Sequence, residues 1–157
     1  MEFDATDLRL LDLLQSDASL SNQALAEQAH TSPATALRRV RRLMDEGVIE
    51  RRVALLNPDR LGAGLTALVE ITLDRQGAEH LDAFEAHAVA DAAVQQCYRV
   101  SPGPDFVLVL LVADMAAYHS LVQRLFTQDA NVRNVKAYFS VKRGKFDLRL
   151  PLRPAAG

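Results

Sequence analysis

The segment from Thr31 to Arg52 constrains this chain more than any other, because it carries complete start and stop signals for one helix. Ser32 can cap the N-terminus, and Pro33 suits the first helical position, where its missing N–H would be unpaired anyway. Gly47 favours the left-handed conformation that ends a helix. The segment therefore predicts a helix that begins at Pro33 and ends just before Gly47.

Helical spacing gives this predicted helix an apolar inner face and an arginine-rich outer face. The inner face is predicted to hold Pro33, Ala36, Leu37, Val40, Leu43 and Met44. The opposite side carries Thr35, Arg38 and Arg42, flanked by Ala34, Arg41 and Arg39. Small residues let a backbone approach DNA, and arginine bridges guanine or holds phosphates in the major groove. The alternative interpretation is a solvated basic face.

Charge is distributed unevenly along the chain. The net charge of the 157 residues is −2, with 49% apolar and 24% charged residues, as in a globular protein. From Arg38 to Arg52, however, six arginines face only Asp45, Glu46 and Glu50, a local balance of +3. A basic patch on an acidic body favours selective docking to DNA. With a single cysteine and no long apolar run, we expect a cytoplasmic protein without disulfides or membrane spans.

Two shorter helices are predicted before the arginine helix. Asp4 and Asp7 form a capping pair at spacing three, and leucines follow at helical spacing to about Ser16. Ser21 then caps a second helix, whose small alanines allow a close crossing. Two short helices, a tight turn and a third helix with outward arginines predict a helix-turn-helix.

The pattern changes after Gly47. Residues 48–56 are β-prone around a basic turn at Glu50–Arg52, which predicts a small wing whose tip lies near DNA phosphates. Turn-forming residues then predict a linker. We therefore divide the chain into a winged helix-turn-helix domain at 1–56, a linker at 57–64 and a second domain at 65–152.

The second domain is predicted to repeat a strand–helix–strand theme. We expect strands at 65–73, 94–100, 106–112 and 132–141, and helices at 77–90 and 115–126. The order βαββαβ predicts a ferredoxin-like fold, so the whole chain is of the α+β class. One sheet face stays uncovered in such a fold, and the strand at 106–112 is apolar on both faces. This exposed apolar sheet predicts a second copy of the chain as partner.

These features together resemble the Lrp/AsnC family, also called feast/famine regulators, over nearly the whole chain. The residues that carry the resemblance are Asp4, Asp7, Leu10–Leu11, Leu20–Asn22, Leu25–Ala26, Ser32–Pro33, Arg39–Leu43, Gly47–Ile49, Ala54–Pro58, Leu61–Gly62, Cys97–Asp105 and Tyr118. The resemblance implies a transcription regulator with a winged helix-turn-helix and a RAM-type domain that binds an effector and forms dimers. It also implies amino acids or related metabolites as effectors, and assembly of dimers into tetramers or octamers.

Two sets of site residues follow. The expected contacts with double-stranded DNA are Ser32, Ala34, Thr35, Arg38, Arg39, Arg41, Arg42, Arg51 and Arg52. The resemblance places the effector near Ser101, Gly103, Asp105, Tyr138 and Ser140. No cofactor or metal is expected.

The effector loop departs from the family pattern. Pro102 stands where the family has a glycine, and proline removes an N–H donor that a ligand carboxylate would use. The Asp105 carboxylate can hold an α-ammonium group. Alternatively, Asp105 caps the backbone of its own loop, and Tyr138 and Ser140 pack in an interface.

Two other function classes compete with a regulator. Some haem-biosynthesis decarboxylases resemble this family from end to end, but His80 and His87 are two turns apart and no third metal ligand accompanies them. A metabolite sensor that does not bind DNA would have lost the arginines on the outer face of the helix that begins at Pro33. Arg38, Arg41 and Arg42 are present, which favours DNA binding and a protein that is not an enzyme.

Overall fold

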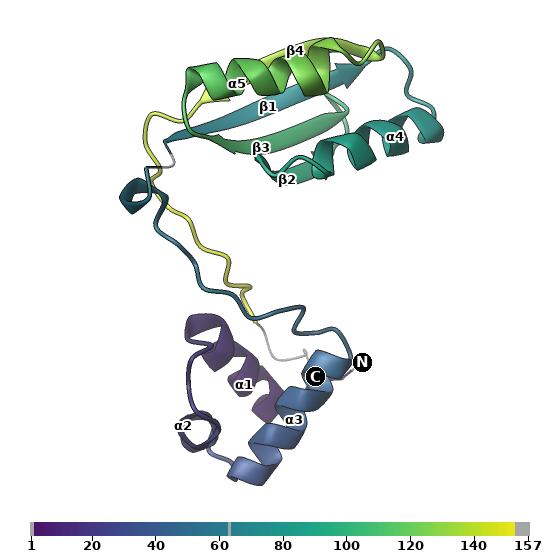
Figure 1. The fold of residues 1–157 in the computed structure, drawn as a ribbon. Coiled ribbons are helices and arrows are strands. Elements are labelled where there is room, and N and C mark those ends of the chain that lie inside the picture. Colours follow the sequence, from purple (N-terminus) through teal and green to yellow (C-terminus); the bar gives the residue numbers. More distant parts are fainter. Residues whose placement is uncertain (1, 63, 153–157) are drawn as a thin grey trace. The chain divides into compact units, whose positions relative to one another are not determined.

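The computed structural model describes residues 2–62 and 64–152, which divide into two units (Figure 1). The first unit comprises the chain up to Leu55 together with the C-terminal segment from Lys145. The second unit runs from Leu56 to Gly144. Each unit has a hydrophobic core of its own. No helix in the described part of the chain has the length and apolar character of a membrane span.

Three capped helices make up the body of the first unit. They are α1 (Ala5–Ser16), α2 (Asn22–Gln28) and α3 (Pro33–Asp45). Asp4, Ser21 and Ser32 are the N-caps, and each side chain accepts backbone N–H bonds from the first turn. Gly47 follows α3 at a φ of 71°, a conformation that favours glycine. The predicted helix-turn-helix is confirmed.

The core of the first unit lies where the three helices meet. Its buried residues are Leu10, Leu14, Leu25, Ala26, Ala29, Ala36 and Val40. The alanines keep the helices close, as the sequence predicts. Leu37 and Met44, however, are 48% and 46% exposed, so their predicted place on the inner face of α3 is wrong. The buried stripe is narrower because it follows Ala36, Val40 and Leu43 alone.

The predicted wing does not form strands. Residues 48–57, all of which are described, have no strand among them, and the chain there is irregular before the short 3₁₀ turn η1 (Pro58–Arg60). Val53, Leu55 and Leu56 are 59%, 64% and 72% exposed. A β-prone segment forms a strand only when a neighbour accepts its hydrogen bonds and covers its apolar side chains.

The second unit has the predicted βαββαβ order. Its elements are β1 (Leu65–Leu73), α4 (Ala78–Val89), β2 (Val94–Arg99), β3 (Phe106–Val112), α5 (Met115–Val122), the π-turn η2 (Gln123–Thr127) and β4 (Val132–Phe139). The sheet order is β2-β3-β1-β4, and all three pairings are antiparallel. This ferredoxin-like arrangement confirms the predicted α+β class.

The two faces of the sheet differ. Alternate residues of β1 and β3, among them Val69, Ile71 and Leu108, are completely buried in one core with residues of α4 and α5. These two helices cover that face of the sheet (Figure 1). The intervening residues point to the other face, where Leu68 is 43% exposed and Val109 is partly buried. The described residues therefore leave an apolar sheet face uncovered, as predicted.

The C-terminal segment contacts α1. The Gln15 amide donates from Nε2 to the Leu150 carbonyl over 2.9 Å and accepts at Oε1 from the Leu150 N–H over 2.8 Å. Arg149 pairs with Asp12 at 3.0 Å. These bonds explain why residues from Lys145 group with the first unit, although the sequence pattern assigns residues up to 152 to the second domain.

Candidate nucleic-acid interface and effector loop

The N-terminus of α3 is held by a local hydrogen-bond network. Ser32 Oγ accepts from the Thr35 N–H over 3.2 Å and donates to Thr35 Oγ1 over 2.9 Å. Asn22 Nδ2 donates to the Pro33 carbonyl over 2.8 Å and so joins α2 to the start of α3. The Ser32 and Thr35 hydroxyls fix the first turn, whose free N–H groups favour an anion such as a phosphate.

The solvent-exposed face of α3 carries two arginines. Ala34, Leu37, Arg38 and Arg41 are all exposed. They border an open hollow of about 510 Å³, whose lining also includes Arg42, Asp45 and Glu46. Within residues 2–62 and 64–152, Arg38 and Arg41 have no hydrogen-bond or ion-pair partner. These two guanidinium groups are therefore available to an external anion.

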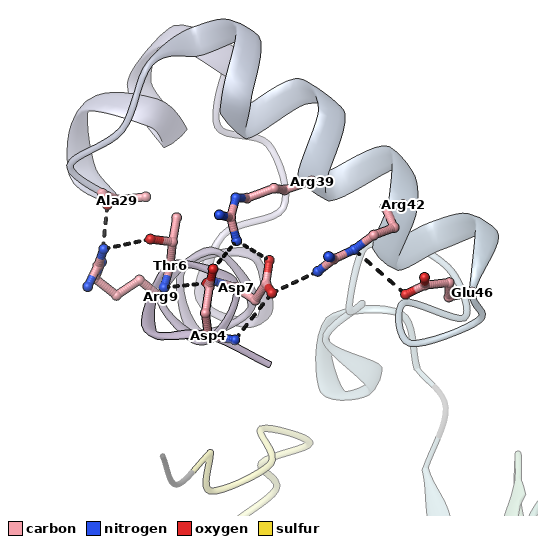
Figure 2. Close-up of polar contacts among 8 residues, drawn as sticks. All are labelled: Asp4, Thr6, Asp7, Arg9, Ala29, Arg39, Arg42 and Glu46. Atoms are coloured by element: carbon pink, nitrogen blue, oxygen red, sulfur yellow. Dashed lines mark hydrogen bonds and ion pairs between the residues drawn. The ribbon is translucent and has the colours of Figure 1, made fainter. Parts of the chain in front are cut away.

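The other two arginines of α3 point toward the first turn of α1 (Figure 2). Arg39 Nη1 donates to Asp4 Oδ2 over 2.6 Å and to Asp7 Oδ1 over 2.9 Å. Arg42 Nη2 donates to Asp7 Oδ2 over 2.7 Å, and its Nε lies 3.7 Å from Glu46 Oε2. Both arginines, predicted to contact DNA, thus form ion pairs within their own unit.

Asp7 is the centre of this ion-pair cluster, which comprises Asp4, Asp7, Arg39, Arg42 and Glu46. It is a buried carboxylate, only 2% exposed. Burial alone would raise the pKa of Asp7, but the bonds from Arg39 and Arg42 outweigh burial and hold that pKa below its ordinary value. The pKa of Asp4 is also lowered, by the Asp7 backbone N–H and by Arg39. Both carboxylates are therefore ionised at neutral pH.

The sequence identified Asp4 and Asp7 as a capping pair and as part of the family resemblance, but not as ion-pair partners of the α3 arginines. The capping box exists, because the Asp7 N–H donates to Asp4 Oδ1 over 2.9 Å and the Asp4 N–H to Asp7 Oδ2 over 3.4 Å. A further signal was present in the sequence. Asp7 is three residues before Leu10 and seven before Leu14, so it lies on the buried stripe of α1. A carboxylate on a buried stripe requires a cationic partner.

Arg9, which belongs to α1, supports the turn that precedes α3. Arg9 Nε donates to the Ala29 carbonyl over 3.1 Å, and Arg9 Nη2 donates to Thr6 Oγ1 over 3.0 Å (Figure 2). Arg51 and Arg52, the predicted phosphate contacts of the wing, are exposed and have no partner among the described residues. They follow α3 in an irregular segment rather than at the tip of a β-hairpin.

The loop between β2 and β3 holds three of the predicted effector residues. Gly103 has a φ of 122°, a backbone conformation that side chains rarely allow, and Ser101 is exposed. Asp105 Oδ2 accepts from the Leu73 N–H over 2.7 Å and from Gln76 Nε2 over 3.3 Å. Asp105 therefore does anchor backbone, but the backbone at the end of β1 rather than that of its own loop.

Of the other two effector candidates, Ser140 lies beside the start of β1 and Tyr138 pairs with Leu68, near the middle of that strand. The Ser140 N–H donates to the Thr66 carbonyl, whereas the Asp105 N–H donates to the Ile71 carbonyl. Five residues of strand separate these two anchor points, about 16 Å. The Tyr138 hydroxyl lies 3.5 Å from Glu70, and Lys136 Nζ lies 5.1 Å from the Tyr138 ring centroid. One chain does not bring the five residues into a single pocket.

Two family models match this chain. The model described as the Lrp/AsnC ligand binding domain matches residues 66–150, more than half of the chain. A second model, described as a winged helix-turn-helix DNA-binding domain, matches residues 3–50. The two matches cover the effector loop and α3, respectively.

Named relatives are transcriptional regulators. The chain is 34% identical over 152 residues to the leucine-responsive regulatory protein of Escherichia coli (strain K12), covering 97% of this chain and 93% of that protein. An uncharacterized HTH-type transcriptional regulator of Haemophilus influenzae is 34% identical over 144 residues, covering 92% and 86%. Both relatives are named as regulatory proteins, so they give no support to the alternative of a decarboxylase.

Solved structures agree over nearly the whole chain. An AsnC family transcriptional regulator from Agrobacterium tumefaciens matches with a TM-score of 0.89 and 31% identity, covering 95% of this chain and 97% of that chain. A transcriptional regulator from Neisseria meningitidis in complex with L-Met matches with a TM-score of 0.88 and 28% identity, covering 95% and 96%. This chain therefore belongs to the Lrp/AsnC family, as a DNA-binding transcriptional regulator with a helix-turn-helix domain and a ligand-binding domain.

Proposed function

We propose that this regulator reads DNA through the exposed face of α3, with Arg38 and Arg41 as its principal cationic contacts. The division of the four arginines on α3 carries the proposal. Arg38 and Arg41 are exposed and free of ion pairs within the described residues, whereas Arg39 and Arg42 are bound to carboxylates. A free guanidinium can bind guanine O6 and N7 or a phosphate without first breaking an internal bond.

The remaining predicted DNA residues have supporting roles in this proposal. Ser32, Ala34 and Thr35 form the first turn of α3, where small side chains let the backbone and its N–H groups approach a phosphate. Arg51 and Arg52 contact the phosphate backbone from the segment after α3. Arg39 and Arg42 hold α3 against α1 instead of touching DNA.

Fluorescence anisotropy tests this assignment. Labelled DNA from upstream of the protein's own gene is titrated with the parent, Arg38→Ala, Arg41→Ala and Arg75→Ala at several salt concentrations. Arg75 is an exposed residue of the second unit and serves as the matched charge control. We expect Arg38→Ala and Arg41→Ala each to weaken binding and to flatten the salt slope by about 0.9. Parent-like binding by both variants would contradict the proposal.

The proposed effector is an amino acid. The Neisseria relative is solved with L-Met, and the Escherichia coli relative is named leucine-responsive. In the present chain Asp105 binds backbone through Oδ2, and Oδ1 has no partner within the described residues, so it can accept a bond from an α-ammonium group. Ser101, Gly103 and Asp105 would form one half of the site, and Tyr138 and Ser140 join them only if a second copy supplies the other half.

The proposed assembly is a cytoplasmic homodimer that forms through the uncovered sheet face and assembles further into tetramers or octamers. The apolar residues on that face, Leu68, Val107, Val109 and Leu111, support it. A twofold dimer presents two copies of α3 in symmetric positions. Its preferred DNA would then be palindromic, with half-sites one helical turn apart or a multiple of that spacing.

A further inference from the structure

We propose that Asp4 and Asp7 are specificity-determining residues, because by holding Arg39 and Arg42 they keep half of the α3 arginines away from DNA phosphates. This inference rests on the proposed DNA face of α3 and deepens it. The relevant chemistry is competition between a carboxylate of the protein and a phosphate of DNA for the same guanidinium group. The protein carboxylate binds the guanidinium group in preference to the phosphate when it is already in position and shielded from water.

The geometry of the cluster favours the internal carboxylates. Five side chains alternate in sign along it, in the order Asp4, Arg39, Asp7, Arg42, Glu46 (Figure 2). Three carboxylates therefore face two guanidinium groups, so this side of α3 presents no net positive charge. Arg38 and Arg41, on the exposed face, have no such partners within the described residues.

Burial restricts the two arginines further. Nε of Arg39 and Nε of Arg42 are both buried and form no hydrogen bond in the described structure. A bidentate contact with guanine or phosphate requires two adjacent N–H groups of one guanidinium. With Nε enclosed and one Nη bound to Asp7, neither arginine can offer its Nε–Nη edge to DNA. Reorientation of both arginines would leave Asp7, at 2% exposure, as a buried charge without a cationic partner.

Keeping Arg39 and Arg42 away from DNA phosphates favours binding to a specific site over binding to random DNA. Affinity for random DNA depends on the number of phosphates that cationic groups neutralise, and each one adds about 0.9 to the salt slope. Base-specific contacts depend on the residues that face the groove. Removing two phosphate contacts therefore weakens binding to random sites while leaving base readout by the exposed face intact.

The test measures binding of the full chain to a labelled random-sequence duplex that lacks the upstream DNA, from 50 to 300 mM salt, roughly the range over which such slopes are read. Asp7→Asn removes the central charge and keeps the side-chain shape. Asp4→Asn removes an exposed charge and remains a good N-cap, so α1 is preserved. Asp45→Asn is the matched control, because Asp45 is exposed on α3 and has no partner among the described residues.

We expect Asp7→Asn to bind the random duplex more tightly than Asp45→Asn and to steepen the salt slope by about 0.9 for each arginine released. Asp4→Asn should change the slope in the same direction but less, because Arg39 keeps its bond to Asp7. Adding Arg39→Gln and Arg42→Gln to Asp7→Asn should return the slope to the parent value. The ratio of upstream to random affinity should fall in Asp7→Asn.

The inference is overturned if folded Asp7→Asn and Asp4→Asn have the same slope as Asp45→Asn, since added net charge would then explain everything. If circular dichroism indicates that Asp7→Asn does not fold, Asp4→Asn alone decides by the same comparison. The proposed DNA face fails separately, through parent-like DNA binding by Arg38→Ala and Arg41→Ala. The two failures are therefore distinguishable.

Discussion

Arg42 Nη2 lies 2.7 Å from Asp7 Oδ2, and this ion pair joins the last turns of α3 to the first turn of α1. The two residues are 35 positions apart in the sequence. Asp7 is buried, whereas the Arg42 side chain is 41% exposed. The charge of an arginine on α3 is thus used to stabilise the helix-turn-helix itself, which leads to a prediction about acid stability.

Asp7→Asn should reduce the loss of stability at low pH. The pKa of Asp7 is lowered on folding, so the cluster stabilises the fold fully above the ordinary carboxyl value of 3.8 and loses that contribution as pH falls through the folded pKa. We expect the free energy of unfolding of Asp7→Asn in urea to be about 2 kcal/mol lower than that of the parent at pH 7, because the arginines lose hydrogen bonds to a charged acceptor. Below about pH 4 this free energy should depend less on pH than it does in the parent. Asp45→Asn is the control. An equally steep acid dependence in Asp7→Asn and parent would contradict the prediction.

Val109→Glu should prevent dimer formation. Val109 lies in the middle of β3, opposite Leu68, on the uncovered sheet face. A carboxylate there would be buried without a partner in an apolar interface, which costs several kcal/mol. Light scattering should give a smaller mass for Val109→Glu than for the parent, because each pairing through this sheet face is lost. Val89→Glu, at an exposed position at the end of α4, should leave the mass unchanged. A parent-sized Val109→Glu would exclude this face as the interface.

Asp105→Asn should weaken amino-acid binding without loosening the loop. An asparagine carbonyl can still accept the Leu73 N–H, but it lacks the charge that an α-ammonium group requires. Loss of a charge-assisted bond should weaken binding about tenfold or more, measured by calorimetry with L-methionine and L-leucine. Asp129→Asn, another loop carboxylate of the second unit, is the control. If Asp105→Asn binds as the parent does, Asp105 serves only to anchor the loop.

Gln15→Ala should release the C-terminal segment from α1. The change removes both hydrogen bonds to the Leu150 backbone, and two exposed bonds are worth about 1 kcal/mol together. Trypsin should then cleave after Lys145 and Arg149 about five times faster. Gln23→Ala, on the exposed surface of α2, is the control and should be cleaved like the parent. Unchanged cleavage in Gln15→Ala would mean that other contacts hold the segment.

Local signals in the sequence predicted most of the fold. Ser32, Pro33 and Gly47 mark the ends of α3 by their own backbone preferences. β1 has the predicted bounds because its apolar residues alternate with a strand's period, and β3 because it is a short continuous apolar run after a turn-forming loop. The prediction of a wing was wrong because Val53 and Leu55 have strand propensity, but no neighbouring strand among the described residues pairs with them. Propensity is a property of a residue, whereas pairing depends on a partner.

The effector residues illustrate the same limit. Gly103 and Asp105 are close in sequence and share one loop, so their proximity was predictable. Tyr138 and Ser140 were grouped with them by resemblance, but the antiparallel register of β4 against β1 places Tyr138 opposite Leu68, near the middle of β1, and Ser140 beside Thr66 at its start. Register is set by many cross-strand contacts, and no single residue encodes it.

The sequence by itself determined that α3 exists, where it begins and ends, and that it carries four arginines. Only the tertiary structure decided which of them face solvent. A helical wheel gives the angle between side chains but not the direction of the neighbouring helix, and α1 places Asp7 beside Arg39 and Arg42. A buried carboxylate binds the nearest cations, because the cost of an unpaired charge exceeds that of giving up two surface arginines.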